Sequence, residues 1–105
     1  MKPDEPAAPA PPPWEVAFDE QALDDLRGLD AAVRHRVRKK LEWLAERADQ
    51  VRLDPLRDEL AGLFKLRVGD WRLVLGRDEE RRLVVVHAIA HRRHIYKIAG
   101  GRLGE

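Results

Sequence analysis

The sequence predicts an α+β fold in which a small antiparallel sheet packs against an α-helical hairpin, with elements in the order β-α-α-β-β-β. Two patterns predict it. Between residues 19 and 48, apolar side chains recur every three or four positions, as in amphipathic helices. In residues 14–18 and 63–75 they alternate with polar or small side chains, as in strands. At 105 residues the chain has room for one domain with one core.

The domain is expected to begin with a strand over residues 14–18, whose three large apolar side chains share one face. Residues 1–13 contain six of the seven prolines, and we expect them to form an extended, disordered arm. The folded domain should then span residues 14–99, with a flexible tail over residues 100–105.

Two helices are expected to follow the first strand. Asp19 has the side chain of an N-cap, and the apolar positions from Ala22 to Leu29 have helical spacing. Asp30 can cap a second, longer helix whose apolar residues recur as far as Ala48. The two helices should form a hairpin.

Three strand-like runs come next. Residues 63–68 and 71–75 flank a Gly-Asp turn and predict a β-hairpin with one apolar and one polar face. Residues 83–90 are apolar on both faces, as in a central strand, and residues 91–99 close the chain as a helical turn. We expect the helical hairpin to cover one face of the sheet and to leave the other open.

Composition excludes several kinds of site. The chain has no cysteine, so it can form no disulfide, thiolate metal site or cysteine nucleophile. It has no apolar run of about 20 residues and no signal-peptide core at its start, so we expect a cytoplasmic protein without a membrane anchor. Phosphate-binding glycine loops, serine-hydrolase elbows and zinc-protease motifs are absent.

The net charge of +1 hides an asymmetry along the chain. From Gly62 onward there are ten Lys or Arg residues and only five Asp or Glu residues. A polyanionic partner should therefore meet the second half of the chain.

Within that half, Lys65, Arg67 and Arg72 share the polar face of the predicted hairpin, and Arg92 leaves the last strand where it can converge with them. Arginine binds phosphate through paired N–H donors, and both residue types stabilise extra charge on a phosphoryl group. A solvated basic face would give the same pattern equally well.

Tyr96 follows Arg92 by four residues and can present a hydroxyl and a ring to a nucleotide, although a core or lid aromatic fits the same position. His91 is the better histidine for proton transfer. His87, His91 and His94 have no carboxylate partner at a recognised ligand spacing, so we expect no metal site.

The run Leu-Arg-Val-Gly-Asp-Trp-Arg at residues 66–72, followed by His-Arg-Arg-His-Ile-Tyr at residues 91–96, resembles the RelE/ParE superfamily of bacterial and archaeal toxins. The opening strand, the first helix and the connector Leu60-Ala61-Gly62 also fit, so the resemblance covers residues 14–99. It implies the toxin of a toxin–antitoxin pair, held inactive by a cognate antitoxin.

The resemblance leaves the toxin's target open. RelE-like members cut mRNA in the ribosomal A site, whereas ParE-like members inhibit DNA gyrase and generally lack the nuclease residues. A third alternative is an inert relative that only binds the antitoxin. Because the basic set and the tyrosine are retained, the resemblance favours a RelE-like mRNA endoribonuclease with the ribosome and mRNA as partners and no small-molecule cofactor.

The resemblance also assigns roles to individual positions. It implies a metal-independent reaction in which the ribose 2′-hydroxyl attacks the adjacent phosphate. The best-known members carry a further lysine where this chain has Leu63, so either Lys65 or His91 would take the proton. The implied catalytic residues are Lys65, Arg72, Arg92, Tyr96 and His91, and the implied RNA-binding residues are Arg67, Arg93 and Lys97.

Overall fold

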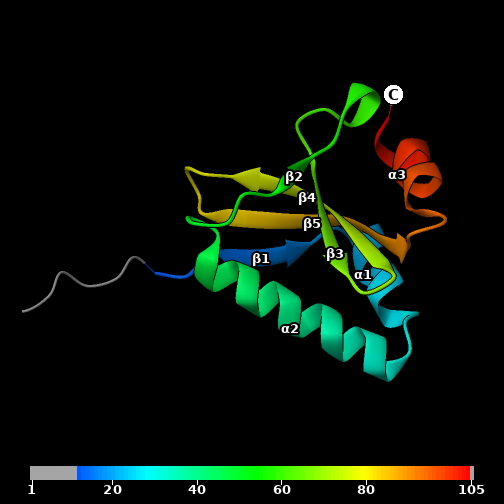
Figure 1. Ribbon diagram of the computed structural model, residues 1–105, viewed down its shortest axis with the longest axis horizontal. Helices are drawn as coiled ribbons and strands as arrows, with labels where there is room; N and C mark the ends of the chain where they lie inside the picture. The colour runs from blue at the N-terminus through cyan, green and yellow to red at the C-terminus, as the bar shows by residue number, and fades with distance from the viewer. Residues whose placement is uncertain (1–11, 105) are drawn as a thin grey trace, which may run out of the picture.

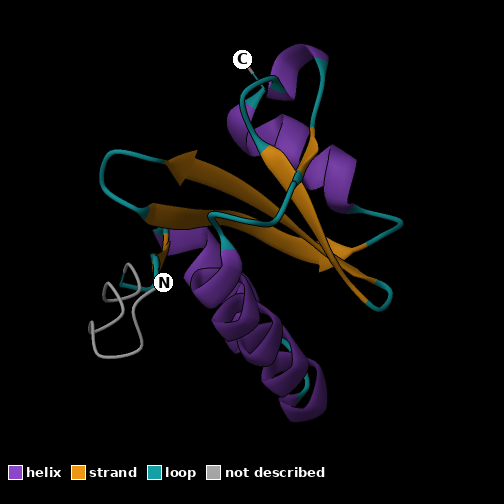
Figure 2. Ribbon diagram, turned by 60° about the vertical axis from the view of Figure 1, so that its left-hand side comes forward, coloured by secondary structure: helices purple, strands orange, loops and turns teal. Residues whose placement is uncertain are grey.

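The computed structural model describes residues 12–104, which form a five-stranded sheet with helices on both faces (Figure 1). The α+β class is confirmed. In Figure 2 the long helix α2 lies on one side of the sheet and α3 on the other. The helices are α1 (Glu20–Arg27), α2 (Ala31–Arg47) and α3 (Ile95–Leu103), with a short 3-10 turn η1 (Asp58–Leu60). The strands are β1 (Glu15–Phe18), β2 (Asp54–Pro55), β3 (Phe64–Val68), β4 (Trp71–Asp78) and β5 (Leu83–His91).

The strand order is β1-β5-β4-β3-β2, and the sheet is antiparallel except at β1. The first strand lies parallel to the last, with Val16 opposite Val84. The predicted hairpin is confirmed as β3 and β4, and the connector adds the two-residue strand β2 beside β3.

The two predicted helices are present, and the caps at their starts differ. Asp19 caps α1 as expected, because its carboxylate accepts a hydrogen bond from the Ala22 N–H at 2.8 Å. Asp30 precedes α2, but its side chain makes no capping hydrogen bond; only its carbonyl accepts one, from the Arg34 N–H.

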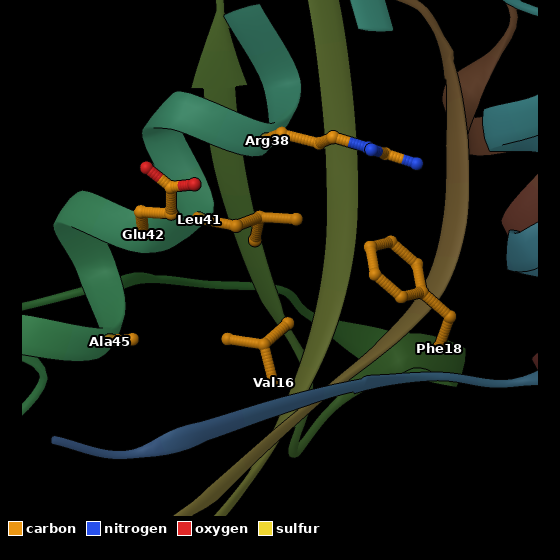
Figure 3. Close-up of a pocket in the computed structure, with 6 residues that line it drawn as sticks. All are labelled: Val16, Phe18, Arg38, Leu41, Glu42 and Ala45. Atoms are coloured by element: carbon orange, nitrogen blue, oxygen red, sulfur yellow. The ribbon is translucent and has the colours of Figure 1, made fainter. Parts of the chain in front are cut away.

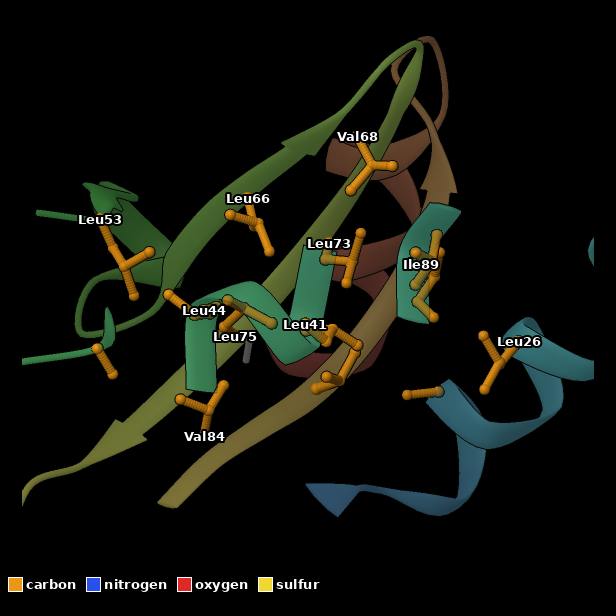
Figure 4. Close-up of a cluster of buried hydrophobic side chains, with 14 of the residues drawn as sticks. Leu26, Leu41, Leu44, Leu53, Leu66, Val68, Leu73, Leu75, Val84 and Ile89 are labelled. Atoms are coloured by element: carbon orange, nitrogen blue, oxygen red, sulfur yellow. The ribbon is translucent and has the colours of Figure 1, made fainter. Parts of the chain in front are cut away.

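The main core lies between the sheet and the α1–α2 pair (Figure 4). Val37, Leu41 and Leu44 recur at helical spacing on α2 and are 0–4% exposed. They meet Leu73 and Leu75 from the inner face of β4, which are completely buried. Burying a side chain of this size contributes about 1.5–3 kcal/mol, so this layer is the main source of stability.

The opposite face of the sheet is also covered, and the prediction that it is open is wrong. The expected closing turn is the longer helix α3, which continues to Leu103, beyond the predicted domain end at residue 99 and into the expected tail. A helix of this length brings enough apolar surface to cover the second face. The covering cluster consists of Leu56, Leu60, Val74, Ala88, Ala90, Ile95 and Ala99.

A β-bulge lets β5 serve both cores. Val74 pairs with Ala88, but the next residue, Leu75, pairs with Val86, so His87 is the extra residue. Val86 consequently faces the main core, and Ala88, two residues later, faces the second cluster.

The expected arm lies outside the described residues apart from positions 12 and 13. The Pro12 carbonyl accepts a hydrogen bond from Nη2 of Arg82 at 2.7 Å. None of the helices within residues 12–104 has the length and apolar character needed to span a membrane.

Candidate functional site

Lys65 and Tyr96 meet on the α3 side of the sheet. Strand alternation places Lys65 on the face away from α2, and the first turn of α3 places Tyr96 above β3. The Lys65 Nζ donates a hydrogen bond to the Tyr96 hydroxyl at 3.0 Å and lies 5.7 Å from the centre of the ring. Tyr96 is 55% exposed, so a ligand can reach both groups.

Arg72 lies on the predicted face, but it is buried there. It stands opposite Arg67 on β3 and Ala90 on β5, and only 9% of its surface is exposed. Its Nη1 donates to the Gly69 and Trp71 carbonyls at 2.7 and 2.9 Å, which fixes the guanidinium against the hairpin turn. Within residues 12–104, Nε and Nη2 make no hydrogen bond, so these donors stay available to an anion.

Arg92 is held over the same turn. Its backbone N–H donates to the Asp70 carbonyl at 2.8 Å, and its Nε lies 3.9 Å from the Asp70 carboxylate. The side chain is 56% exposed. By register Arg67 on β3 stands opposite Arg72 on β4, and Arg92 lies two residues beyond Ala90, the β5 partner of Arg72.

His91 lies on the other face of the sheet. It pairs with Trp71, and the two rings meet edge to face with their centres 5.6 Å apart. Trp71 packs against the main core, whereas Lys65 is on the face of the second cluster. His91, one of the two expected proton acceptors, therefore does not share a face with Lys65, because alternation along β5 turns neighbouring residues to opposite faces.

The three expected RNA-binding residues are solvent-accessible. Arg67 leaves β3 beside Arg72, Arg93 lies in the turn before α3, and Lys97 follows Tyr96 on α3. None of the ion pairs found within residues 12–104 involves them.

The structure adds residues that the sequence did not single out. Lys65 and Tyr96 line a groove of about 480 Å³ together with the connector residues Asp54, Arg57 and Asp58. Asp58 has a φ of 55°, a conformation that is strained for a residue with a side chain. The connector has no periodicity to relate it to the hairpin, so only the pairing of β2 with β3 reveals this neighbourhood.

The histidines do not gather into a metal centre. The His87 Nδ1 lies 2.9 Å from the Asp19 carboxylate, and the His91 and His94 rings are 6.3 Å apart. Within residues 12–104, no three His, Cys, Asp or Glu side chains gather closely enough to hold a metal ion.

Two ionic clusters lie outside the cationic site, the name we give to Lys65, Arg72, Arg92 and Tyr96. Asp25 forms a bidentate ion pair with Arg102 at 2.7 and 2.8 Å, and this hydrogen bonding raises the pKa of Arg102. Asp49 accepts hydrogen bonds from Arg82 and from the Trp14 indole, and both lower the pKa of its carboxyl group. Both clusters join distant segments of the fold, so we assign them a structural role.

A separate groove of about 300 Å³ opens between β1 and α2 (Figure 3). Val16 and Phe18 line it from β1, and Leu41 and Ala45 line it from α2, with the charged Arg38 and Glu42 beside them. Because its lining is largely apolar, this groove suits an apolar side chain better than a phosphate.

Comparisons with known proteins agree on one family. The model of the ParE toxin of type II toxin–antitoxin systems, parDE, matches residues 16–96. A chain of the RelBE2 toxin–antitoxin complex from Mycobacterium tuberculosis is 33% identical, with a TM-score of 0.69 over 76% of this chain and 92% of that chain.

The isolated RelE toxin of E. coli is 28% identical, with a TM-score of 0.64 over 85% of this chain and 97% of that chain. The archaeal RelE–RelB complex from Pyrococcus horikoshii, 17% identical, is similar in fold, with a TM-score of 0.59 over 75% of this chain and 94% of that chain. No curated protein sequence gives a significant match.

Proposed function

Because the chain belongs to the ParE toxin family of type II toxin–antitoxin systems, within the RelE/ParE superfamily, we propose that it is a ribosome-dependent mRNA endoribonuclease that inhibits translation. The contact between Lys65 and Tyr96, on the sheet face that also carries Arg72, with Arg92 at the adjoining hairpin turn, is the observation that carries the proposal. A gyrase inhibitor has no need of these four groups in one place.

In the proposed reaction the ribose 2′-hydroxyl of the mRNA loses its proton and attacks the adjacent phosphorus. The bond from phosphorus to the 5′-oxygen breaks, which leaves a 2′,3′-cyclic phosphate and a 5′-hydroxyl that takes up a proton. Arg72 and Arg92 donate hydrogen bonds to the phosphate oxygens and stabilise the charge that develops on them. Neither step requires a metal ion.

Lys65 is the group that we propose for removing the 2′-hydroxyl proton. Leu63 packs against the second cluster and has no proton-transfer group, and His91 is on the opposite face. Tyr96, hydrogen-bonded to Lys65, orients the nucleotide through its hydroxyl and its exposed ring.

We further propose a cognate antitoxin as the chain's partner and the cytoplasm, where ribosomes translate, as its location. The relative from M. tuberculosis is itself part of a toxin–antitoxin complex, which supports the first proposal. Much of the alignment of mRNA would come from the ribosome, so free RNA should be cut poorly.

The test is to add the purified protein to translating ribosomes and map new mRNA 5′ ends. Arg92→Ala should lower the cleavage rate about 100-fold, because it removes a donor to the charged phosphate. Tyr96→Phe, which keeps the ring, should lower it roughly 10-fold. The control is Arg27→Ala on α1, which removes another exposed arginine and should leave cleavage unchanged.

Gyrase inhibition is the second candidate, because the matching family model is that of the parDE toxin. Growth arrest with intact mRNA and gyrase-linked DNA breaks would replace the nuclease proposal with this one. Absence of toxicity for the folded protein would leave an inert antitoxin-binding relative.

A further inference from the structure

A second basic surface lies next to the cationic site, on α2 and the edge of β3. It consists of Arg36, Lys39, Lys40, Trp43 and Arg67, and we call it the α2 basic surface. These residues line two adjoining grooves of about 450 and 220 Å³. The spacing of the helical residues, at three and four positions, keeps them on one side of α2.

Most of the positive charge on this surface is not neutralised. None of the ion pairs within residues 12–104 involves Arg36, Lys40 or Arg67. Lys39 has Glu42 at 3.8 Å, with both side chains about two-thirds exposed, so water screens that pair strongly. Several cations therefore remain free to attract a polyanion.

Trp43 positions one of these cations. The Lys40 Nζ lies 4.1 Å from the centre of the indole ring, within cation–π distance. An aromatic ring can hold the ammonium group in place without neutralising its charge or taking up its N–H donors with a carboxylate. Trp43 is 36% exposed, so it also offers ring surface to a ligand.

The α2 basic surface is continuous with the cationic site. Arg67 lines both of the grooves beside α2. Lys65 lines the second of these grooves and also the groove that contains Tyr96. An extended strand can thus follow cations from α2, around the edge of β3, to the Lys65–Tyr96 contact.

We propose that the α2 basic surface binds the phosphate backbone of single-stranded RNA that extends from the Lys65–Tyr96 contact. A cationic groove with an interleaved aromatic ring is the common architecture for binding single strands without sequence preference. An acidic protein segment could pair with the cations of the α2 basic surface. It would have no use for the exposed indole of Trp43 or for the line of cations that leads to Tyr96. The inference rests on the proposed function for the identity of the strand, but binding requires no cleavage.

The test uses a fluorescein-labelled 12-nucleotide 2′-O-methyl oligouridylate, which has no free 2′-hydroxyl and cannot be cut. Fluorescence anisotropy at several salt concentrations gives its Kd for the full chain. A triple variant, Arg36→Gln with Lys39→Gln and Lys40→Gln, should weaken binding at least 10-fold. It should also flatten the plot of log Kd against log salt concentration by about two units, at roughly 0.7 for each lost phosphate contact.

The matched control removes the same charge elsewhere, through Arg27→Gln, Arg38→Gln and Arg81→Gln. Its affinity for the RNA should fall less than threefold. Trp43→Leu, which keeps an apolar side chain but removes the ring, should weaken binding roughly threefold through loss of the cation–π contact. Thermal unfolding establishes that each variant is folded.

Equal weakening by the two triple variants would overturn the inference, because net charge alone would then explain binding. Unchanged RNA affinity in the α2 triple variant, with reduced affinity for the antitoxin, would also overturn it and assign the surface to the protein partner. If no mRNA is cleaved but the α2 triple variant alone loses RNA binding, the nuclease proposal fails and the inference stands.

Discussion

Asp25 connects three segments that are far apart in the sequence. Its carboxylate accepts the Ile89 N–H at 2.9 Å, on the edge of β5 beyond the end of β1, and it pairs with both terminal nitrogens of Arg102 on α3. The side chains of Asp25 and Arg102 are 16% and 20% exposed, so water compensates poorly for a lost partner.

Asp25→Ala should therefore lower the free energy of unfolding by about 2 kcal/mol or more, since it leaves a backbone N–H and a guanidinium without their acceptor. Urea denaturation measures this loss. The neighbouring Asp24, 72% exposed and 3.8 Å from Arg27, provides the control. Asp24→Ala should cost less than about 0.5 kcal/mol; equal losses at the two positions would contradict the assigned role.

The interactions of Asp49 predict that the stability of the fold depends on pH. Its pKa is lowered, first by the hydrogen bonds from Arg82 and then by that from Trp14, so the folded state favours the ionised carboxylate. This stabilisation is complete above the ordinary carboxyl pKa, near 4, and is lost as the pH falls through the lowered value.

Asp49→Asn should accordingly be less stable than the parent chain at pH 7, by a small amount because the carboxylate is exposed. The difference in unfolding free energy should shrink below about pH 4. Denaturant titrations at a series of pH values measure it, and a difference independent of pH would rule out the ionic contribution.

The residue types at these positions were visible in the sequence, but their partners were not. Charge alternation correctly assigned Lys65 and Arg72 to one face of the hairpin. It could not indicate that Arg72 is buried, because that face is covered by α3, which the alternation of charges along the hairpin does not reveal. The role of Arg102 was missed for the same reason: it was assigned to a flexible tail.

Among the elements, β5 depends on its bulge at His87 to contribute side chains to both apolar layers. The His87 ring lies against Gly76 on β4: a Cβ on Gly76 would come within 2.9 Å of the His87 Nε2. Asp19 holds the other side of the ring at 2.9 Å, so the ring cannot easily move away. The glycine leaves the space that the extra residue of the bulge requires.

Gly76→Ala should thus destabilise the fold by about 1–2 kcal/mol through overpacking. In a His87→Ala background the same change should cost less than about 0.5 kcal/mol, and unfolding titrations of the four combinations measure the coupling. Gly100→Ala on α3 is the control, because no atom lies near its Cβ position. It should be neutral or stabilise the helix by up to about 1 kcal/mol. An equal cost of Gly76→Ala in both backgrounds would exclude the His87 clash.

The helices and the hairpin were predictable because their signals are local: apolar spacing along α2 and alternation along β3 and β4. The bulge was not, since Val84, Val86 and Ala88 read as one continuous apolar strand. Only the pairing with β4 shows that the alternation changes face at His87.

At the scale of the whole molecule, the sheet separates two apolar layers. Ile89 is 3% exposed in the main core, and Ile95 is 1% exposed in the second cluster. Because Ile89 and Ile95 lie on opposite faces of the sheet, the same substitution can be made in each of the two apolar layers.

Ile89→Val and Ile95→Val should each lower the free energy of unfolding by about 0.5–1.5 kcal/mol. The double variant should lose the sum of the two within about 0.5 kcal/mol, because sites without shared neighbours are usually additive. Chemical denaturation of the three variants measures this. A larger coupling would mean that the two layers behave as one core.

The second layer explains why the whole-molecule prediction succeeded only in part. The fold class follows from element order, and the helical hairpin does cover one face. The parallel pairing of β1 with β5 has no local signal, because apolar alternation in residues 14–18 fits either direction and any free strand edge.

That pairing has a consequence for the order in which the protein can fold. Within residues 12–104, β1 pairs only with β5, because β1 lies at the edge of the sheet and β5 is its one neighbouring strand. Until β5 has been synthesised, β1 has no partner and the main core lacks Val84, Val86 and Ile89. Contacts this distant in sequence form late and close a long loop of chain. Until β5 has been added to the chain, the protein therefore lacks the folded surface that carries Lys65 and Tyr96.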